Sequence, residues 1–204
     1  MAREILTIRK RTYVKVTKAA DPPPPVDTGV VRIISGGQTG ADRAALDWAI
    51  ANGIAHGGWC PAGRRAENGM IPTNYQLKET SSHDYTLRTR LNVRDSDATL
   101  IISQAPKLAG GSLFTRQIAM EMGKPWLHLH RGLDAPSTLS AFLAMHRVKV
   151  LNIAGPRASK ESGIKAFAIQ TLNECRTVLQ GNLQSLTPAQ AKHKEGKETE
   201  AGLG

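Results

Sequence analysis

The chain has 204 residues, of which 40% are hydrophobic, and it carries a formal net charge of +10 at neutral pH. This length fits a single domain, and no apolar run approaches the roughly 18–20 residues of a membrane span, so we expect no membrane partner and a cytoplasmic location. Two cysteines, Cys60 and Cys175, are too few for a disulfide framework or a zinc site of cysteine pairs, and the positive charge favours an anionic partner.

Both ends of the chain differ in composition from its middle. Residues 1–28 are basic and include the run ADPPPPVDTG, whose prolines lack backbone donors, so they predict a basic arm followed by a flexible linker. Residues 183–204 are polar and rich in charge, which predicts a disordered tail. The folded domain is therefore expected at residues 29–182.

Within that domain, short apolar runs alternate with helical patterns. In chain order we expect a strand over 30–35, a helix over 40–52, a short strand over 56–61 and, after a polar connection, a strand near 75–79. There follow a helix over 84–96, a strand over 98–103, a glycine turn that opens a helix at 110, a strand over 125–130, a helix near 136–147, a strand over 148–155 and a long helix over 159–180. This alternation predicts one three-layer α/β domain with a mostly parallel sheet and helices on both faces.

The first expected strand runs directly into glycines and then into a helix, in the stretch IISGGQTGADRA. Main-chain N–H groups of such a turn, together with the helix N-terminus, can hold an anion, and two side chains there can add hydrogen bonds. The candidate ligand residues are Gly36, Gly37, Gln38, Thr39 and Gly40. The turn lacks the Walker spacing and its lysine, which disfavours a nucleoside triphosphatase. A tight turn that simply requires glycine remains the alternative.

Two further glycine-containing segments follow later strands, and carboxyl ends of parallel strands meet at one edge of a sheet. The segment AGGSLFT contributes the candidates Gly110, Gly111, Ser112 and Thr115, and the segment NIAGPRAS contributes Gly155 and Arg157. Together with the first turn, they favour a phosphorylated ligand at that edge.

Arginine side chains supply the remaining candidate ligand residues. Arg64 and Arg65 lie in a loop shaped by glycine and proline, and their planar guanidinium groups suit phosphate or carboxylate. Arg88 and Asn92 lie four residues apart on one face of the expected helix. For each, an exposed basic loop or an exposed helix face is the alternative.

No catalytic residue and no metal ligand can be assigned from spacing. The carboxylates expected near the site, Asp42, Glu67, Asp95 and Asp97, form no pair with evident acid and base roles. Cys60 and the histidines His83, His128 and His130 show no metal-ligand signature, and we interpret them as structural.

The ordered motifs GGQTGADRAALDWA, GWCPAGRRAENGMIP, YQLKETSSHDYTLRTRLNVRDSDATLI and LNIAGPRAS resemble the molybdenum carrier family. This family is a circularly permuted branch of the SLOG superfamily of Rossmann-like proteins, related to the lysine decarboxylase-like, cytokinin-activating enzymes, and the similarity spans roughly residues 30–178. The resemblance implies a Rossmann-like fold and, as carried ligand, molybdenum cofactor (molybdopterin), which is passed to apo-molybdoenzymes. Because this cofactor binds its metal through its own sulfurs, the protein need only grip phosphate and pterin. By analogy the resemblance also implies a homodimer or homotetramer.

Other functions stay open at this point. The cytokinin-activating relatives carry a PGGxGTxxE turn, whereas the matching stretch here, from Ala109 to Gln117, lacks the proline and the glutamate. This difference argues against hydrolysis of a nucleotide N-glycosidic bond, as by a phosphoribohydrolase. That activity nevertheless stays the alternative, with Glu67 or Asp95 as acid or base. A nucleotide-ligand sensor is another. Nucleic-acid binding is disfavoured because few aromatic residues could stack on bases.

Overall fold

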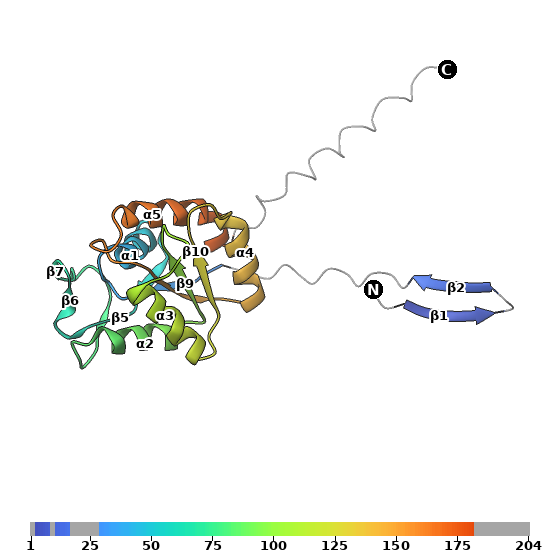
Figure 1. The fold of residues 1–204 in the computed structure, drawn as a ribbon, viewed down its shortest axis with the longest axis horizontal. Helices are drawn as coiled ribbons and strands as arrows, with labels where there is room; N and C mark the ends of the chain where they lie inside the picture. Colours follow the sequence, from blue (N-terminus) through green and yellow to red (C-terminus); the bar gives the residue numbers. More distant parts are fainter. Residues whose placement is uncertain (1–2, 9–10, 17–28, 182–204) are drawn as a thin grey trace, which may run out of the picture.

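The computed structural model describes residues 3–8, 11–16 and 29–181 (Figure 1). Its helices are α1 (Ala41–Ala51), α2 (Tyr85–Arg94), α3 (Gly110–Glu121), α4 (Ala135–His146), α5 (Ile164–Glu174), α6 (Arg176–Leu179) and the 3-10 turn η1 (Ala62–Arg64). Its strands are β1 (Arg3–Ile8), β2 (Arg11–Val16), β3 (Arg32–Ile34), β4 (Ala55–Gly57), β5 (Trp59–Cys60), β6 (Arg65–Ala66), β7 (Gly69–Met70), β8 (Lys78–Glu79), β9 (Ala98–Ile102), β10 (Trp126–Leu129) and β11 (Val150–Ala154).

A five-stranded parallel sheet forms the centre of the domain, in the order β10-β9-β11-β3-β4. When the strands are followed from β11 through β3 to β4, and then through β9 to β10, the order is that of a doubly wound dinucleotide-binding sheet. Here β11, which corresponds to the first strand of that order, comes last in the chain. The sheet is thus a circularly permuted Rossmann-like sheet, and its switch point lies between β11 and β9.

Helices cover both faces of this sheet, as predicted. In Figure 1, α1 and α5 lie together on one side, and α2 and α3 lie on the other. The larger core lies under α1, α4 and α5, and alternate strand residues such as Leu100, Ile102 and Leu151 point into it. A smaller cluster around Val93, Ile118 and Ala119 joins α2 to α3. The predicted single three-layer α/β domain is confirmed.

Local chemistry explains where the predicted elements differ from the observed ones. The expected strand over 56–61 is two short strands, because Gly58 adopts a φ of 124° and sends β5 away from the main sheet to pair with β8. The expected helix over 159–180 begins only at Ile164, after Gly163 with a φ of 76°, and is divided at Cys175 into α5 and α6. Side chains with a Cβ rarely adopt such positive φ values, so glycine is strongly favoured at both positions.

The N-terminal extension contains β1 and β2, which pair antiparallel as a two-stranded sheet of their own. They do not join the five-stranded sheet as an additional edge strand. Most of the predicted linker within residues 1–28 and the predicted tail at 183–204 lie outside the described residues. In the part of the chain that the structure describes, no helix is long and apolar enough to cross a bilayer.

Candidate functional site at the carboxyl edge of the sheet

The loops that follow β3 and β11 meet at the start of α1. A Cβ placed on Gly40 would lie 2.4 Å from the carbonyl oxygen of Pro156, and one on Gly155 would lie 2.2 Å from the carbonyl oxygen of Ile102. The Ala41 N–H at the start of α1 donates to the Pro156 carbonyl at 3.2 Å. These two glycines therefore permit the close backbone approach that brings the predicted motifs to one place.

Gln38 lies at the centre of this edge with its side chain almost fully buried. Its Oε1 accepts hydrogen bonds from the main-chain N–H groups of Thr39 and Glu67, both at 3.0 Å. These two donors fix the orientation of the amide, so that its Nε2 is a buried donor without a hydrogen-bond partner among the described residues. An unmade hydrogen bond of a buried group costs about 1–3 kcal/mol, so this donor is expected to bind an acceptor supplied by a ligand or an ordered water.

Arg88 and Asp42 form an ion pair beside the same turn. Arg88 Nη1 lies 3.0 Å from Asp42 Oδ2, and their side chains are only 15% and 3% exposed. Asp42 Oδ2 also accepts from the Gln38 N–H at 3.3 Å. Burial raises the pKa of Asp42, and the charge of Arg88 opposes that shift without cancelling it. The Nε of Arg88 is a second buried donor that finds no partner within the described chain.

Gly36 makes room for this arginine. A Cβ at position 36 would lie 1.7 Å from Arg88 Nη1 and 2.9 Å from Asp42 Oδ2. The guanidinium group of Arg88 therefore packs directly on the backbone of the first glycine turn. The structure thus brings together four predicted residues, Gly36, Gln38, Gly40 and Arg88, and adds Asp42.

Glu67 joins the two loops from a third segment, the tip between β6 and β7. Its carboxylate accepts from the hydroxyl groups of Thr39 and Ser159 and from the Ser159 N–H at 3.2 Å, and Arg157 Nε lies 3.9 Å away. Burial raises the pKa of Glu67, but the hydrogen bonds from Ser159 and Thr39 outweigh it, and the pKa is lowered overall. An anionic group of the protein thus already binds to the two predicted anion-binding loops.

The second glycine segment opens α3 directly. Gly110 and Gly111 are exposed and form the first turn of the helix, and the Thr115 hydroxyl donates to the Gly111 carbonyl at 2.9 Å. Ser112 is buried, and its Oγ has no hydrogen-bond partner among the residues described. Because α3 follows β9, this turn belongs to the carboxyl side of the sheet. The loop after β9 is tied to the loop after β11 by a hydrogen bond of 2.6 Å from Gln104 Nε2 to the Ser162 carbonyl.

Two of the predicted residues instead hold loops in place. The guanidinium group of Arg64 donates to four main-chain carbonyls, those of Ile71, Leu77, Pro72 and Tyr75, at 2.8–3.3 Å. Asn92 is buried and binds both the N–H and the carbonyl of Trp59, at 2.8 and 3.0 Å. Arg65 is exposed in β6. The ligand role predicted for these three remains a prediction.

The sequence missed the connecting role of Glu67 and the pairing of Asp42 with Arg88. Both carboxylates were expected near the site. However, Asp42 and Arg88 are 46 residues apart in the sequence, and nothing in this spacing indicates their contact. Within the described residues there is no group of three or more His, Cys, Asp or Glu that could hold a metal ion. Both cysteines are buried and free.

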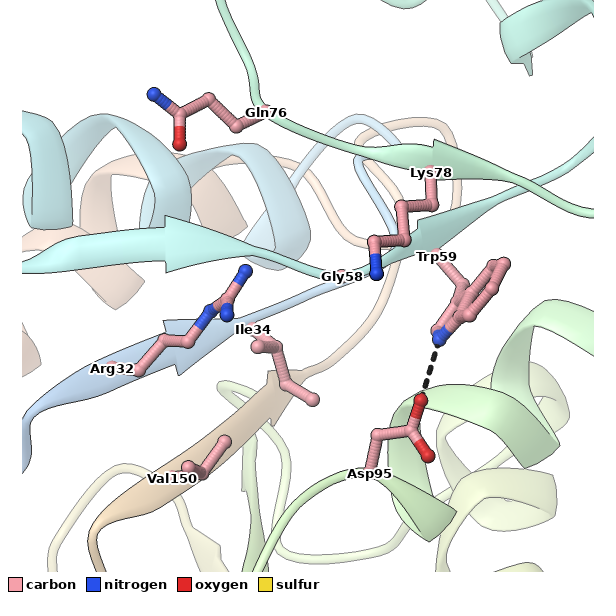
Figure 2. Close-up of a pocket in the computed structure, with 8 residues that line it drawn as sticks. All are labelled: Arg32, Ile34, Gly58, Trp59, Gln76, Lys78, Asp95 and Val150. Carbon is pink, nitrogen blue, oxygen red and sulfur yellow. Dashed lines mark hydrogen bonds between the residues drawn. The ribbon is translucent and has the colours of Figure 1, made fainter.

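A cavity lies on the face of the sheet that α2 covers, and none of Gln38, Asp42, Glu67 and Arg88 lines it (Figure 2). Arg32 and Ile34, the first and last residues of β3, both line it, so it extends along the whole length of that strand. Val150, the first residue of β11, lines it as well. Trp59 and Asp95 form another wall, with the indole Nε1 donating to Asp95 Oδ2 at 2.7 Å. None of its lining residues was among the predicted ligand residues.

The fold and this edge define a Rossmann-like α/β protein of the SLOG type. The sequence model of the "Circularly permutated YpsA SLOG family" matches residues 33–176, and the chain belongs to that family. A crystal structure described as a "Putative molybdenum carrier protein", from Syntrophus aciditrophicus SB, shares 46% sequence identity with a TM-score of 0.69, and the match covers 72% of this chain and 95% of that one. No curated protein matches the chain. The predicted resemblance is therefore confirmed. The strand order shows the permutation directly, because β11 takes the place of the first strand of the sheet but comes last in the chain.

Proposed function

We propose that this protein binds a phosphorylated pterin or nucleotide-like ligand at the carboxyl edge of its sheet, and that it carries molybdenum cofactor. The observation that supports this most is the pair of buried donors, Gln38 Nε2 and Arg88 Nε, which have no partner in the described part of the chain. Gln38 lies in the first glycine turn, beside the N-terminus of α1, and Arg88 packs against that turn from α2. Such a turn suits phosphate oxygens. The printed name of the similar crystal structure supports the choice of cargo.

The residues at this edge fit the phosphate and pterin parts of such a ligand. Gln38, Arg88 and the buried Ser112 hydroxyl would donate hydrogen bonds to phosphate or to the polar edge of the pterin. When bound, the cofactor supplies its own sulfur ligands to molybdenum, so the metal is cargo. In this proposal the role of the chain is to bind, orient and shield the cofactor, and then to release it to an apo-molybdoenzyme. A homo-oligomer is part of the same proposal.

The hydrogen bonds of the Glu67 carboxylate to Thr39 and Ser159 occupy donors that a bound phosphate would use. A phosphate that approaches Thr39 and Ser159 meets the carboxylate already bound to them, and two anions repel each other. Ligand binding therefore requires the 65–70 segment to move or Glu67 to take up a proton.

Identification of the ligand that co-purifies with the full-length chain tests this function directly. Mass spectrometry should find a pterin, and molybdenum should be stoichiometric with it. Purified cofactor should bind the apo-protein, and Gln38→Glu should weaken binding by about 10–100-fold, because it keeps the acceptor oxygen and replaces the unpaired donor by a negative oxygen. Gln117→Glu, on the exposed face of α3, is the matched control. A bound nucleotide without molybdenum would contradict the carrier function.

A second candidate function is hydrolysis of a nucleotide N-glycosidic bond. The pKa values of Asp42 and Glu67 are shifted in opposite directions, and Gln38 links the two residues, since it donates to Asp42 and accepts from the N–H of Glu67. Carboxyl groups with divergent pKa values are typical of acid and base pairs. Release of free base from nucleoside monophosphates would support this function, and its absence with a bound pterin would favour the carrier.

A further inference from the structure

The cavity shown in Figure 2 has an aromatic wall that is held rigidly. Asn92 fixes the backbone of Trp59 through its N–H and its carbonyl, and Asp95, one helical turn later, accepts from the indole N–H at 2.7 Å. Gly58, whose Cβ would lie 2.2 Å from the carbonyl oxygen of Ser35, lets this segment pack closely on β3. Trp59 is nevertheless only partly buried, so one part of a fixed indole borders open space.

Two cationic side chains face the same space. In Figure 2, Lys78 from β8 and Arg32 from β3 extend toward each other from opposite sides of Gly58. Lys78 Nζ lies 5.6 Å from the centroid of the Trp59 ring. Among the described residues, neither the Arg32 guanidinium nor the Lys78 ammonium has a carboxylate within ion-pair distance.

The one carboxylate of the cavity is already used. Asp95 Oδ1 lies 2.6 Å from Arg94 Nε, and Oδ2 accepts from the Trp59 indole. Arg94, which does not line the cavity, contributes most to lowering the pKa of Asp95, and the charge of Lys78 contributes less. The lining therefore carries two cations against one satisfied anion. The excess of positive charge favours an anionic ligand, and the fixed indole offers a face on which a planar ring can stack.

The size of the cavity limits what it can hold. Its volume is about 140 Å³, and a cavity of roughly 150 Å³ can hold one benzene molecule. We propose that this cavity is a second ligand site, lined by none of Gln38, Asp42, Glu67 and Arg88, which binds a small phosphate- or carboxylate-bearing molecule and encloses at most one ring of it. Its oxyanion lies between Arg32 and Lys78, and its body lies against Trp59. This proposal does not depend on the carrier function.

The indole N–H signal of Trp59 provides a local readout in the full-length protein. The chain has three tryptophans, so ¹⁵N-labelled protein gives three such signals, and Trp59→Phe assigns the relevant one. Inorganic phosphate, benzoate and benzylamine are titrated separately at constant ionic strength. We expect phosphate or benzoate to shift the Trp59 signal saturably while Trp48 and Trp126 change little, and we expect benzylamine, a cation of similar size, to leave it unchanged.

Two variants and a control connect the shift to the proposed cations. Arg32→Gln and Lys78→Gln should each weaken binding by about tenfold or more, because each removes a charged hydrogen-bond donor. Arg90→Gln, an exposed arginine of α2 paired with Glu121, should bind as the wild type does. Binding of phosphate alone would identify a phosphate-bearing ligand, and binding of benzoate alone a carboxylate. The proposal is overturned if neither anion gives a saturable shift, if benzylamine binds as well as benzoate, or if Arg90→Gln weakens binding as much as the cavity variants.

Discussion

Replacing Arg88 by Met tests the account of the carboxyl edge most directly. The substitution keeps an unbranched apolar side chain in place of the aliphatic part of Arg88 and removes the charge that lies 3.0 Å from Asp42. The Asp42 side chain is only 3% exposed, so its carboxylate would be left buried without its cationic partner. Removing one member of a buried ion pair costs about 3–5 kcal/mol of folding free energy. For a domain with a total stability of roughly 5–15 kcal/mol, this loss is large.

The dependence on pH has a definite sign. Burial already raises the pKa of Asp42, and without the opposing charge of Arg88 the pKa rises further. The folded variant is therefore penalised while Asp42 is ionised. As the pH falls toward the raised pKa, the carboxyl takes up a proton and the penalty relative to wild type shrinks.

Urea denaturation of wild type and variant, at neutral and at mildly acidic pH, measures both effects. The double variant Asp42→Asn, Arg88→Met should recover most of the lost stability, because it leaves no buried charge. Arg90→Met is the control, since its partner Glu121 is 56% exposed and such surface pairs contribute only about 0–1 kcal/mol. A loss for Arg88→Met that is no larger than that of the control, or that does not change with pH, would refute this account of Asp42.

Three other predictions concern neighbouring features. Glu67→Gln should lower stability by about 1–3 kcal/mol at neutral pH. Because the pKa of Glu67 is lowered in the folded state, its contribution is complete above the unfolded pKa and is lost as the pH falls through the folded pKa, so denaturation at falling pH should show the difference shrink. Gly155→Ala should lower the free energy of unfolding by about 1–3 kcal/mol, because the new Cβ would lie 2.2 Å from the Ile102 carbonyl oxygen. The control Gly111→Ala has open space around its Cβ and should be neutral or stabilising, and thermal melts of both variants measure the difference. Cys60 and Cys175 should react with a thiol reagent only after unfolding, because burial raises the pKa of both thiols, that of Cys175 to about 12. A rapid reaction of the native protein would contradict this prediction.

The sequence alone was sufficient for the order and type of most elements. Apolar runs such as ATLII at 98–102 form fully buried strands, and glycines end or begin helices where their φ values are positive. The motif order was also sufficient to identify the family, which the match over residues 33–176 confirms. These properties are local, since each depends on residues that are neighbours along the chain.

Only the tertiary structure decided which side chains meet at the carboxyl edge. Asp42 and Arg88 come from different helices, and Glu67 reaches Ser159 across 92 residues of chain, contacts that no local pattern encodes. The tertiary structure also showed that Arg64, predicted as a residue that binds phosphate or carboxylate, donates to four loop carbonyls. It further showed that Trp59, Arg32 and Lys78 share a cavity. Backbone propensity and hydrophobic period determine where strands and helices form, whereas the partner of a charged side chain is set by the packing of distant segments. The elements could therefore be read from the sequence, while the pairing of charges at the site required the fold.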